Sequence, residues 1–411
     1  MNDPNVTDPV AMPTSHSGLF DPPDELSKLR HEQPLARVRY ANGEVGWLVT
    51  SHSIAKAVMT DQRFGRGGHE TQLKTNPLMG ASRYEEFEKA LEPYGDWRPM
   101  RGFIFMDPPD HTRYRRLLAP YFSSRRMEEF RPRIEHIVAG RLLAMAEAGP
   151  PADLVQDFAI PISLWSQCTL LGVPPGEVDR FFRLGTIFFD PAVRPADVVE
   201  AWRNAWDYVR QLTVNRRRMP ENDLISEVAA HGELTDDEIA DTALVLFQGG
   251  LETTGDMLAL GAFVLLEHPS QLESLRADDS RIVPATEELL RYSGIFRLIT
   301  RTALAEVELA GHRIRAGEVV TISLAAANRD PDKFHHPDEL DLARTASGHV
   351  GFAQGIHMCI GQDLARIELQ VGLLQLVKRF PNLRLAVPKA DVPVYGPEMG
   401  NFGVHKLPVI W

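Results

Sequence analysis

Two patterns of apolar and polar residues follow each other along the chain. Near the amino terminus, residues 35–40 and 45–50 carry alternating apolar side chains and flank a short polar turn, which is typical of a β-hairpin. From about Arg113 onward, apolar residues recur with helical spacing. Two further strand-like runs, residues 307–309 and 319–323, interrupt the helices. The pattern predicts a mostly helical protein with a minor β-sheet part.

One predicted helix is much longer than the others. Thr235 is a favourable N-cap residue, acidic residues follow it, and the apolar pattern then continues to about His268. At about 1.5 Å per residue this helix would be roughly 50 Å long. Its middle reads Gly-Gly-Leu-Glu-Thr-Thr-Gly over residues 249–255, although each glycine there costs up to about 1 kcal/mol relative to alanine. The pattern alone leaves two explanations open, a close helix crossing or a functional site.

Composition and charge narrow the class of protein. The 411 residues include 44 basic and 56 acidic side chains, and the net charge of −12 argues against general affinity for nucleic acid or anionic membranes. The two cysteines, Cys168 and Cys359, provide no disulfide framework and suit a reducing cytoplasm. Residues 1–17 contain no apolar segment long enough for a membrane anchor. We therefore expect a soluble cytoplasmic protein, with a flexible tail over residues 1–20 and a folded part over residues 21–411.

Cys359 lies in a window that suits a metal-bound thiolate. Residues 352–361 read Phe-Ala-Gln-Gly-Ile-His-Met-Cys-Ile-Gly and immediately precede a helical run. A thiolate ligand needs protection from protonation, hydrogen bonds and a fixed approach to the metal. Gly355 allows a close approach of the backbone, and the following helix adds its positive N-terminal end. A lone cysteine is more often a small buried hydrophobe, which is our interpretation of Cys168.

The window resembles the haem-binding signature of the cytochrome P-450 family, Phe-x-x-Gly-x-His-x-Cys-x-Gly, at all five defining positions. One departure is Ala353, where similar proteins usually carry glycine. The resemblance implies a single-domain P-450 fold whose long central helix passes over the haem. It also implies haem b, iron protoporphyrin IX, as the cofactor, with Cys359 as the iron ligand and Phe352 in the cofactor-binding set.

The same resemblance assigns roles within residues 249–255. Monooxygenases of this family carry Ala/Gly-Gly-x-Asp/Glu-Thr-Thr in the corresponding helix. By resemblance, Thr253 would hydrogen-bond dioxygen and a water, and Glu252 would relay protons from solvent. Gly249 and Gly250 would leave room for oxygen and substrate, and Gly250 would belong to the cofactor-binding set. Members that use peroxide typically lack the acid and alcohol pair, so its presence favours dioxygen and electron delivery.

Haem propionates need cationic or hydrogen-bonding partners, because buried charges are costly without them. His111 and Arg115 are spaced so that both project from one face of a helix. Alone, this pattern favours a solvated basic face. The resemblance implies that the two side chains bind a propionate, together with Arg301 and His357. Three further arginines could attract an acidic redox partner to the proximal surface: Arg113, Arg116 and Arg366.

Glu288 and Arg291 have the Glu-x-x-Arg spacing that places both charges on one helical face. The bare pattern is weak, since many exposed helices contain it. The resemblance implies that this pair is buried and holds the haem-binding core, so that its role would be structural.

The expected substrate pocket is mainly apolar, which favours an apolar substrate. Its expected residues are Val245, Leu246, Leu298, Ile299 and Phe402. Arg297 could contact an anion, although similar proteins often have a polar side chain there that turns away. The loop over residues 66–102 contains a helix-like piece from Tyr84 to Leu91, and we expect it to act as a lid over the pocket.

These expectations combine into a soluble haem-thiolate monooxygenase of the actinobacterial type. It would insert one oxygen atom into an apolar small molecule by hydroxylation or epoxidation, in specialised metabolism, with the substrate free or bound to a carrier protein. Electrons would come from a separate ferredoxin and ferredoxin reductase. Three alternatives use the same fold: oxidative coupling of aromatic rings, a peroxide-driven peroxygenase, and a haem-thiolate binding or gas-sensing protein without turnover.

Overall fold

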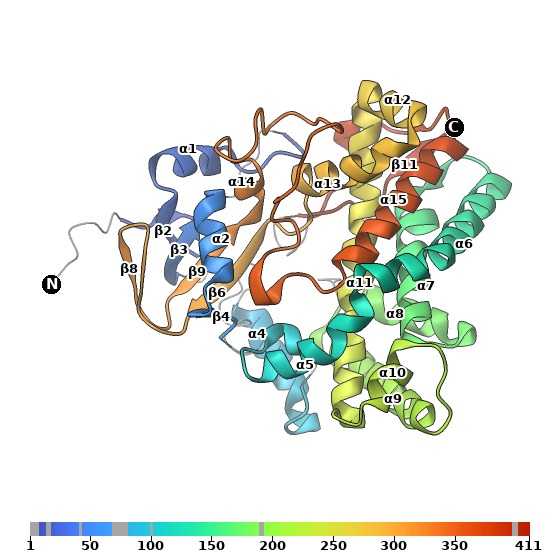
Figure 1. Ribbon diagram of the computed structural model, residues 1–411, viewed down its shortest axis with the longest axis horizontal. Coiled ribbons are helices and arrows are strands. Elements are labelled where there is room, and N and C mark those ends of the chain that lie inside the picture. Colours follow the sequence, from blue (N-terminus) through green and yellow to red (C-terminus); the bar gives the residue numbers. More distant parts are fainter. Residues whose placement is uncertain are drawn as a thin grey trace. The chain divides into compact units, whose positions relative to one another are not determined.

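The computed structural model is mostly helical and carries small β-sheets, as the sequence predicts (Figure 1). The structure describes residues 8–13, 18–40, 43–67, 81–98, 102–188, 193–396 and 402–411. The chain folds into two compact units. The first unit comprises Met1–Gly80, Leu260–Gln362 and Val394–Gly403, and the second unit comprises Ala81–Ala259, Asp363–Pro393 and Val404–Trp411.

A six-stranded mixed sheet forms the centre of the first unit. In spatial order its strands are Val10–Ala11 (β1), Leu35–Arg39 (β2), Val45–Val49 (β3), Val319–Ser323 (β9), Leu298–Ala303 (β6) and Phe64–Gly65 (β4). β2 and β3 form the expected antiparallel hairpin. β3 and β9 are parallel, whereas β6 is antiparallel to both β9 and β4. This sheet therefore brings the amino-terminal hairpin beside strands from the second half of the chain.

The first unit also contains helices, some of which lie beside this sheet. They are Asp24–Glu32 (α1), His52–Thr60 (α2), Pro269–Ala277 (α12), Ile282–Tyr292 (α13) and Leu324–Asn328 (α14). In Figure 1, α1, α2 and α14 lie beside the sheet. Val49 of β3, Val58 of α2 and Ile322 of β9 belong to one buried apolar cluster, so the alternating apolar residues of the strands are directed into a shared core.

The two strand-like runs near residue 310 form strands in different sheets. β9 joins the main sheet, while Val307–Leu309 (β7) pairs with His312–Ile314 (β8) in a separate hairpin. Ala310 and Gly311 connect β7 to β8 with φ angles of 49° and 79°, which is the left-handed conformation that tight hairpin turns require. The sequence pattern did not reveal β6 or β8, because neither shows a clear alternation of apolar and polar residues.

The predicted tail over residues 1–20 is described in part. Residues 1–7 and 14–17 lie outside the described residues, whereas β1 pairs in parallel with β2. The flexibility of this tail stays a prediction.

The second unit is largely helical. Its helices are Ala81–Leu91 (α4), Asp110–Leu118 (α5), Ser124–Ala148 (α6), Ile160–Leu171 (α7), Val178–Phe188 (α8), Pro195–Arg218 (α9), Leu224–Ala230 (α10) and Gln362–Arg379 (α15). A small antiparallel sheet contains Arg384–Leu385 (β10), Pro408–Ile410 (β11) and Ala152–Asp153 (β5). The carboxyl terminus is thus fixed in the second unit by β11.

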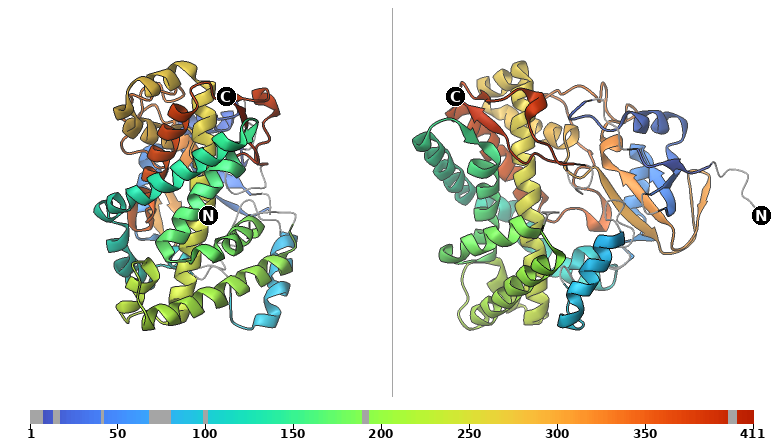
Figure 2. Two further views of the ribbon diagram at one scale, coloured as in Figure 1. Left: turned by 90° about the vertical axis from the view of Figure 1, so that its right-hand side faces the viewer. Right: turned by 180° about the vertical axis from the view of Figure 1, so that it is seen from behind.

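The long helix predicted from the sequence is α11, Asp236–Glu267, with 32 residues. Its start is a capping box: the Thr235 hydroxyl accepts from the Glu238 backbone N–H, and the Glu238 carboxylate accepts from the Thr235 backbone N–H. Figure 2 shows α11 as one uninterrupted helix. A Cβ atom at Gly255 would lie 2.7 Å from Ile160 of α7, so part of its small-residue segment does serve a close helix crossing.

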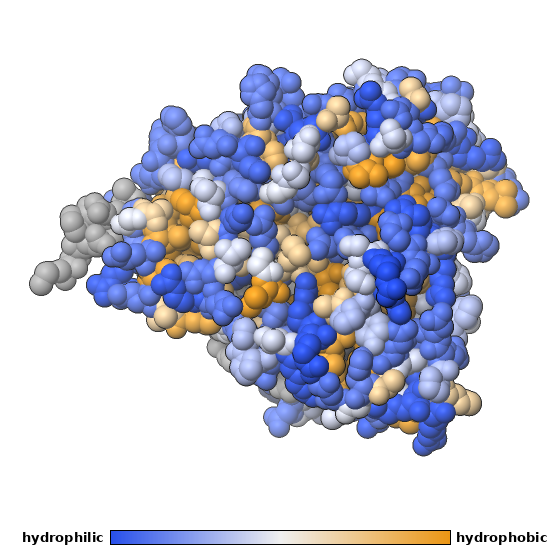
Figure 3. Space-filling view, in the orientation of Figure 1, coloured by the Kyte–Doolittle hydropathy of each residue, from blue (hydrophilic) through white to orange (hydrophobic). Residues whose placement is uncertain are grey.

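The visible face in Figure 3 carries mostly hydrophilic residues, with hydrophobic residues in scattered groups. Among the described residues, no helix combines the length and apolar character that crossing a membrane requires.

Candidate functional site

The cysteine loop of the first unit connects a short 3-10 helix, Gly355–His357, to the start of α15. The Cys359 thiol is exposed. Its backbone N–H donates to the carbonyl oxygen of Phe352 at 2.9 Å, which ties the two ends of the loop together. The thiol therefore stands on a loop of fixed backbone, immediately before the N-terminus of a long helix.

Two residues of this loop have a left-handed backbone. Gly355 has a φ of 78°, and a Cβ atom there would lie 2.1 Å from the carbonyl oxygen of Met59 in α2. A side chain at position 355 would therefore clash with the backbone of α2. This clash explains the glycine independently of any close approach of the backbone to a flat cofactor. Ala353, where glycine is usual in similar proteins, has a φ of 56°, so this departure from the signature is accommodated at a cost in backbone strain.

Arg301 and His357 also belong to the first unit. Arg301 is a buried residue of β6, and its guanidinium donates to the carbonyl oxygen of Thr300 at 2.9 Å. His357, in the 3-10 helix, is half-buried, as is Phe352. A buried guanidinium offers positive charge and several N–H donors, so Arg301 is a suitable partner for an acidic group of a cofactor.

Glu288 and Arg291 form an ion pair in α13 with both side chains fully buried, and the contact distance is 2.7 Å. Arg291 donates to both carboxylate oxygens of Glu288 and to the carbonyl oxygens of Asn328 and Pro337. Arg344 donates a further hydrogen bond to Glu288 at 3.1 Å. The pair therefore joins α13, the end of α14 and the segment after it into one network within the first unit.

In the second unit, His111 and Arg115 lie on α5, as their spacing predicts. His111 is buried, and burial together with the charge of Arg115 lowers the pKa of its imidazole. His111 is therefore a neutral hydrogen-bonding group near neutral pH, while Arg115 supplies the positive charge.

Two arginines of the same helix are already paired with acidic residues. Arg113 contacts Glu238 at 2.6 Å, and Arg116 contacts Glu233. Arg366, on α15, is 3.5 Å from Asp363. The expectation that these three arginines offer free positive charge to an acidic partner is therefore weakened, because each has an acidic neighbour within its own unit.

The acid and alcohol pair lies in the middle of α11. Glu252 is buried, and burial followed by the charge of Asp256 raises the pKa of its carboxyl group to about 9. The Glu252 side chain is thus protonated at neutral pH and can donate a proton. The hydroxyl of Thr253 donates to the carbonyl oxygen of Gly249 in the preceding turn.

The two glycines before this pair have different surroundings. A Cβ atom on Gly249 would have no neighbour within 4 Å, whereas one on Gly250 would lie 2.1 Å from the side chain of Gln167 in α7. The expectation that both glycines leave room for oxygen and substrate is corrected for Gly250. Gly250 is small because α7 packs against it, and the open space is at Gly249.

Sequence reasoning missed a buried acid in α15. Glu368 is fully buried, and burial raises the pKa of its carboxyl group to about 8, although the nearby hydroxyls of Ser166 and Thr254 lower it in part. The available signal was a glutamate among apolar residues, between Ile367 and Leu369. Cys168 is buried as expected, and burial raises the pKa of its thiol to about 12.

The expected pocket residues fall in both units. Val245 and Leu246 of α11 are buried, and Val245 packs against Gly102, where a Cβ atom would lie 2.4 Å away. In the first unit, Leu298 and Ile299 are half-buried at the start of β6. Phe402 is buried, and its backbone N–H donates to the carbonyl oxygen of Ile295 at 2.7 Å.

The loop over residues 66–102 is described in part, since residues 68–80 and 99–101 lie outside the described residues. Its helix-like piece is α4, longer at its start than predicted. Trp97 packs with its ring 6.4 Å from that of Trp206 in α9, and the guanidinium of Arg203 lies over both rings. The proposed lid function stays a prediction.

Each unit, taken by itself, carries groups that suit a haem. The first unit offers an exposed thiol on a fixed loop, a buried arginine and a half-buried histidine: Cys359, Arg301 and His357. The second unit offers an imidazole and guanidinium on one helix and open space beside Gly249. A thiolate is an established haem ligand, and arginine and histidine are suitable donors for propionates.

Comparison with known proteins identifies the family. The family model for Cytochrome P450 matches residues 196–408. The chain is 40% identical to Cytochrome P450 105C1 of a Streptomyces species, over 98% of this chain and 99% of the relative. It is also 40% identical to Nocardicin C N-oxygenase of Nocardia uniformis subsp. tsuyamanensis, over 98% of this chain and 97% of the relative.

A solved structure, CYP105P1 in complex with filipin I, agrees with the fold at a TM-score of 0.87. It is 34% identical to this chain and is matched over 98% of this chain and 99% of its own. The chain therefore belongs to the cytochrome P450 family and is a haem-dependent monooxygenase of the actinobacterial type.

Proposed function

We propose that this enzyme inserts one atom of dioxygen into a mainly apolar small molecule, with electrons from a separate ferredoxin and ferredoxin reductase. The observation that carries the proposal is the buried, protonated Glu252 beside Thr253 in the middle of α11. A haem held by the Cys359 thiolate would supply electron transfer and activation of dioxygen. That chemistry needs protons, and a carboxylic acid next to a hydroxyl can deliver them.

In this proposal Glu252 is the proton donor and Thr253 passes the proton on. At neutral pH the Glu252 carboxyl keeps its proton, because burial raises its pKa to about 9. The Thr253 hydroxyl now donates to Gly249, and a rotation about its side-chain bond would redirect that hydrogen toward the open space at Gly249. After each transfer, Glu252 would recover a proton from solvent.

The remaining residues bind and hold the cofactor. Cys359 would ligate the iron, with Phe352 and Gly250 among the residues around the haem. Four side chains would bind the propionates: His111, Arg115, Arg301 and His357. The buried contacts of Arg291 with Glu288 and with two carbonyl groups support a structural role for this pair.

Apolar side chains support a mainly apolar substrate. Val245, Leu246, Leu298, Ile299 and Phe402 are half-buried or buried and would line the pocket. The names of the relatives support a place in specialised metabolism, since one is an N-oxygenase of nocardicin C and another binds filipin I. We propose hydroxylation or epoxidation in the cytoplasm, which suits a chain whose two cysteines form no disulfide.

The test compares Thr253→Ala with Thr242→Ala. Both hydroxyls bond a carbonyl four residues earlier in α11, so the second variant controls for loss of a helix hydroxyl. A ligand that shifts the haem spin state is identified first, and NADPH use and product are then measured with surrogate ferredoxin and reductase. Thr253→Ala should keep its haem and consume NADPH with little product, whereas Thr242→Ala should remain coupled.

Two results would contradict the proposal. If Thr253→Ala couples NADPH use to product formation as well as wild type does, the proton path assigned to Thr253 is wrong. Equal or faster product formation with hydrogen peroxide alone would indicate a peroxygenase instead.

A further inference from the structure

His349 is a buried histidine of the first unit, shortly before the cysteine loop. Its side chain is 3% exposed, and both ring nitrogens have a partner. Nδ1 accepts from the backbone N–H of Gly351 at 3.0 Å, and Nε2 lies 3.1 Å from the carboxylate of Glu287 in α13. Because a backbone N–H can only donate, Nδ1 must be the acceptor, and Nε2 carries a proton and donates to Glu287. These two contacts therefore fix the tautomer of His349.

The hydrogen bond to Gly351 acts on the first residues of the cysteine loop. Gly351 directly precedes Phe352, whose carbonyl oxygen accepts from the Cys359 backbone N–H at 2.9 Å. The ring of Phe352 also lies near that of His349, with the two centroids 6.0 Å apart. A continuous series of contacts thus leads from Glu287 through the imidazole to the backbone of the proposed iron ligand.

The backbone of Gly351 packs directly against the imidazole. A Cβ atom at this position would lie 3.1 Å from Nδ1 of His349 and 3.0 Å from the carbonyl oxygen of Leu290 in α13. Such a close approach suits glycine, because any side chain would push the loop away from its acceptor. The hydrogen bond and the small residue therefore serve the same contact.

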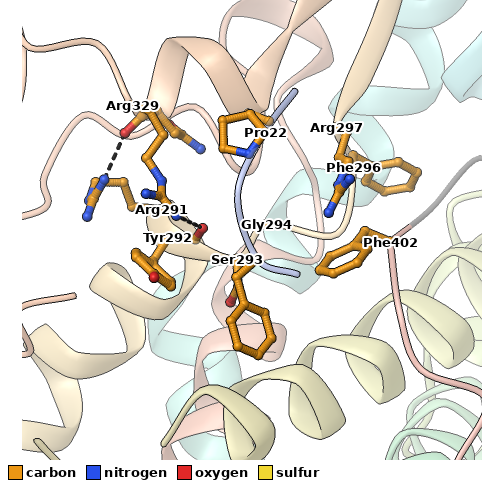
Figure 4. Close-up of a pocket in the computed structure, with 12 residues that line it drawn as sticks. Pro22, Arg291, Tyr292, Ser293, Gly294, Phe296, Arg297, Arg329 and Phe402 are labelled. Atoms are coloured by element: carbon orange, nitrogen blue, oxygen red, sulfur yellow. Dashed lines mark hydrogen bonds between the residues drawn. The ribbon is translucent and has the colours of Figure 1, made fainter. Parts of the chain in front are cut away.

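A second contact holds the neighbouring residue. The backbone N–H of Val350 donates to the side-chain oxygen of Asn328 at 2.8 Å, and both residues are buried. The carbonyl oxygen of Asn328 in turn accepts from Arg291 of α13. Arg329, which follows Asn328, donates back to the carbonyl oxygen of Tyr292 at the end of α13 at 3.1 Å (Figure 4). The start of the cysteine loop is thus attached to α13 by two separate routes.

We propose that His349 is a positioning residue for the thiolate. Through Nδ1 it fixes the backbone of Gly351 and Phe352, and thereby the place of Cys359. The inference rests on the proposed function, in which Cys359 binds haem iron. A thiolate ligand needs a fixed approach to the metal and protection from protonation. His349 acts only through the loop, so its loss should weaken thiolate ligation without removing any group from the cofactor.

Three substitutions separate the two hydrogen bonds of this side chain. His349→Asn places an amide oxygen where Nδ1 lies, so it keeps the acceptor for Gly351 and loses the contact with Glu287. His349→Gln reaches the place of Nε2, so it keeps a donor for Glu287 and loses the acceptor for Gly351. His349→Leu loses both. The comparison of Asn with Gln therefore isolates the bond to the loop.

The measurement follows the thiolate-type Soret band of the reduced, carbon monoxide-bound holoprotein over time in urea below the unfolding transition. His349→Gln and His349→Leu should lose this band about threefold to tenfold faster than wild type, the effect of one buried hydrogen bond. His349→Asn should stay within about twofold of wild type, since it retains that bond. Amide hydrogen exchange over residues 350–359 should rank the variants in the same order, because the N–H groups of Gly351 and Cys359 are both bonded there.

A second buried histidine supplies the matched control. His52 of α2 lies with Nε2 2.8 Å from the carbonyl oxygen of Gly348, one position before His349. His52→Leu loses a buried hydrogen bond of similar kind, so it should unfold at lower urea concentration than wild type. Below its own unfolding transition it should keep the thiolate-type band as long as wild type does.

The inference is wrong if His349→Asn loses the band as fast as His349→Gln, or if His349→Gln keeps it at the wild-type rate. It is also wrong if His52→Leu loses the band as fast as His349→Gln, because general loss of stability would then explain the effect. If His349→Leu does not fold, the comparison of Asn with Gln decides. In each contrary case, coupled turnover by wild type would leave the proposed function standing. A haem-loaded wild type without a thiolate-type band would instead contradict the proposed function.

Discussion

Replacing Arg291 by alanine should remove much of the folding stability of the protein. The side chain is fully buried and makes hydrogen bonds to both carboxylate oxygens of Glu288 and to the carbonyl groups of Asn328 and Pro337. Its loss leaves a buried carboxylate without its main counter-charge, which costs about 3–5 kcal/mol. Each buried carbonyl that loses its donor adds about 1 kcal/mol or more.

These costs reach or exceed 5 kcal/mol, while a folded protein is stable by only about 5–15 kcal/mol. Arg344 limits the loss, because it still donates to Glu288 at 3.1 Å. We therefore expect Arg291→Ala to fail to retain haem, or to unfold at much lower urea concentration than wild type. Arg291→Lys keeps the charge but not the planar fork and should be intermediate.

Urea unfolding followed by circular dichroism and by the haem Soret band measures this loss. Arg313→Ala is the matched control, because it breaks an ion pair whose side chains are 63% and 51% exposed and should cost about 0.5 kcal/mol or less. A folded Arg291→Ala holoprotein within about 1 kcal/mol of wild type would refute the reasoning from buried contacts.

Three other perturbations follow from the structure. Gly355→Ala should release haem and lower the stability of the protein by more than about 2 kcal/mol in a thermal melt, because it adds backbone strain and a clash with Met59. In the same melt Gly140→Ala should be neutral or stabilising, because Gly140 lies in a helix beside open space. The folded-state pKa of Glu368, about 8, is raised above that of the unfolded chain, so its contribution is complete below pH 4 and is lost as the pH rises toward 8. Glu368→Gln should therefore gain stability relative to wild type across that window in urea titrations, and a constant difference would argue against a buried titrating acid. In wild type, the coupling of NADPH use to product formation should fall as the pH rises through about 9, where Glu252 ionises. In Glu252→Gln, coupling should be low at every pH and should not change near pH 9.

Features with a local physical cause were predictable from the sequence. The capping box at Thr235 and the continuous apolar pattern fix the start and length of α11. The amino-terminal hairpin follows from alternation and a polar turn. The Glu-x-x-Arg spacing predicted that two charges share a helical face, and the structure adds that the face is buried.

Features that depend on partners far along the chain were not predictable. Gly250 is small because of Gln167, which lies 83 positions earlier in the sequence. Gly355 is required by the backbone of α2. The buried state of Glu368 depends on α7 and α11. Its apolar neighbours Ile367 and Leu369 are a signal within α15, but they do not show which groups cover the carboxyl.

Charge pairing was the other feature that the sequence could not decide. Arg113 and Arg116 look like free cations in the sequence, and each meets a glutamate more than 100 residues away. An isolated stretch of sequence gives the charges but not the neighbours that neutralise them.

The central claim is that the Cys359 thiolate binds haem iron in an enzyme that activates oxygen. The most direct measurement is the spectrum of the reduced protein with carbon monoxide, for wild type and for Cys359→His. The account predicts a thiolate-type Soret band in wild type and its replacement by a histidine-type band, with loss of NADPH-dependent product, in the variant. A thiolate-type band that survives in Cys359→His, or its absence from haem-loaded wild type, would contradict the account.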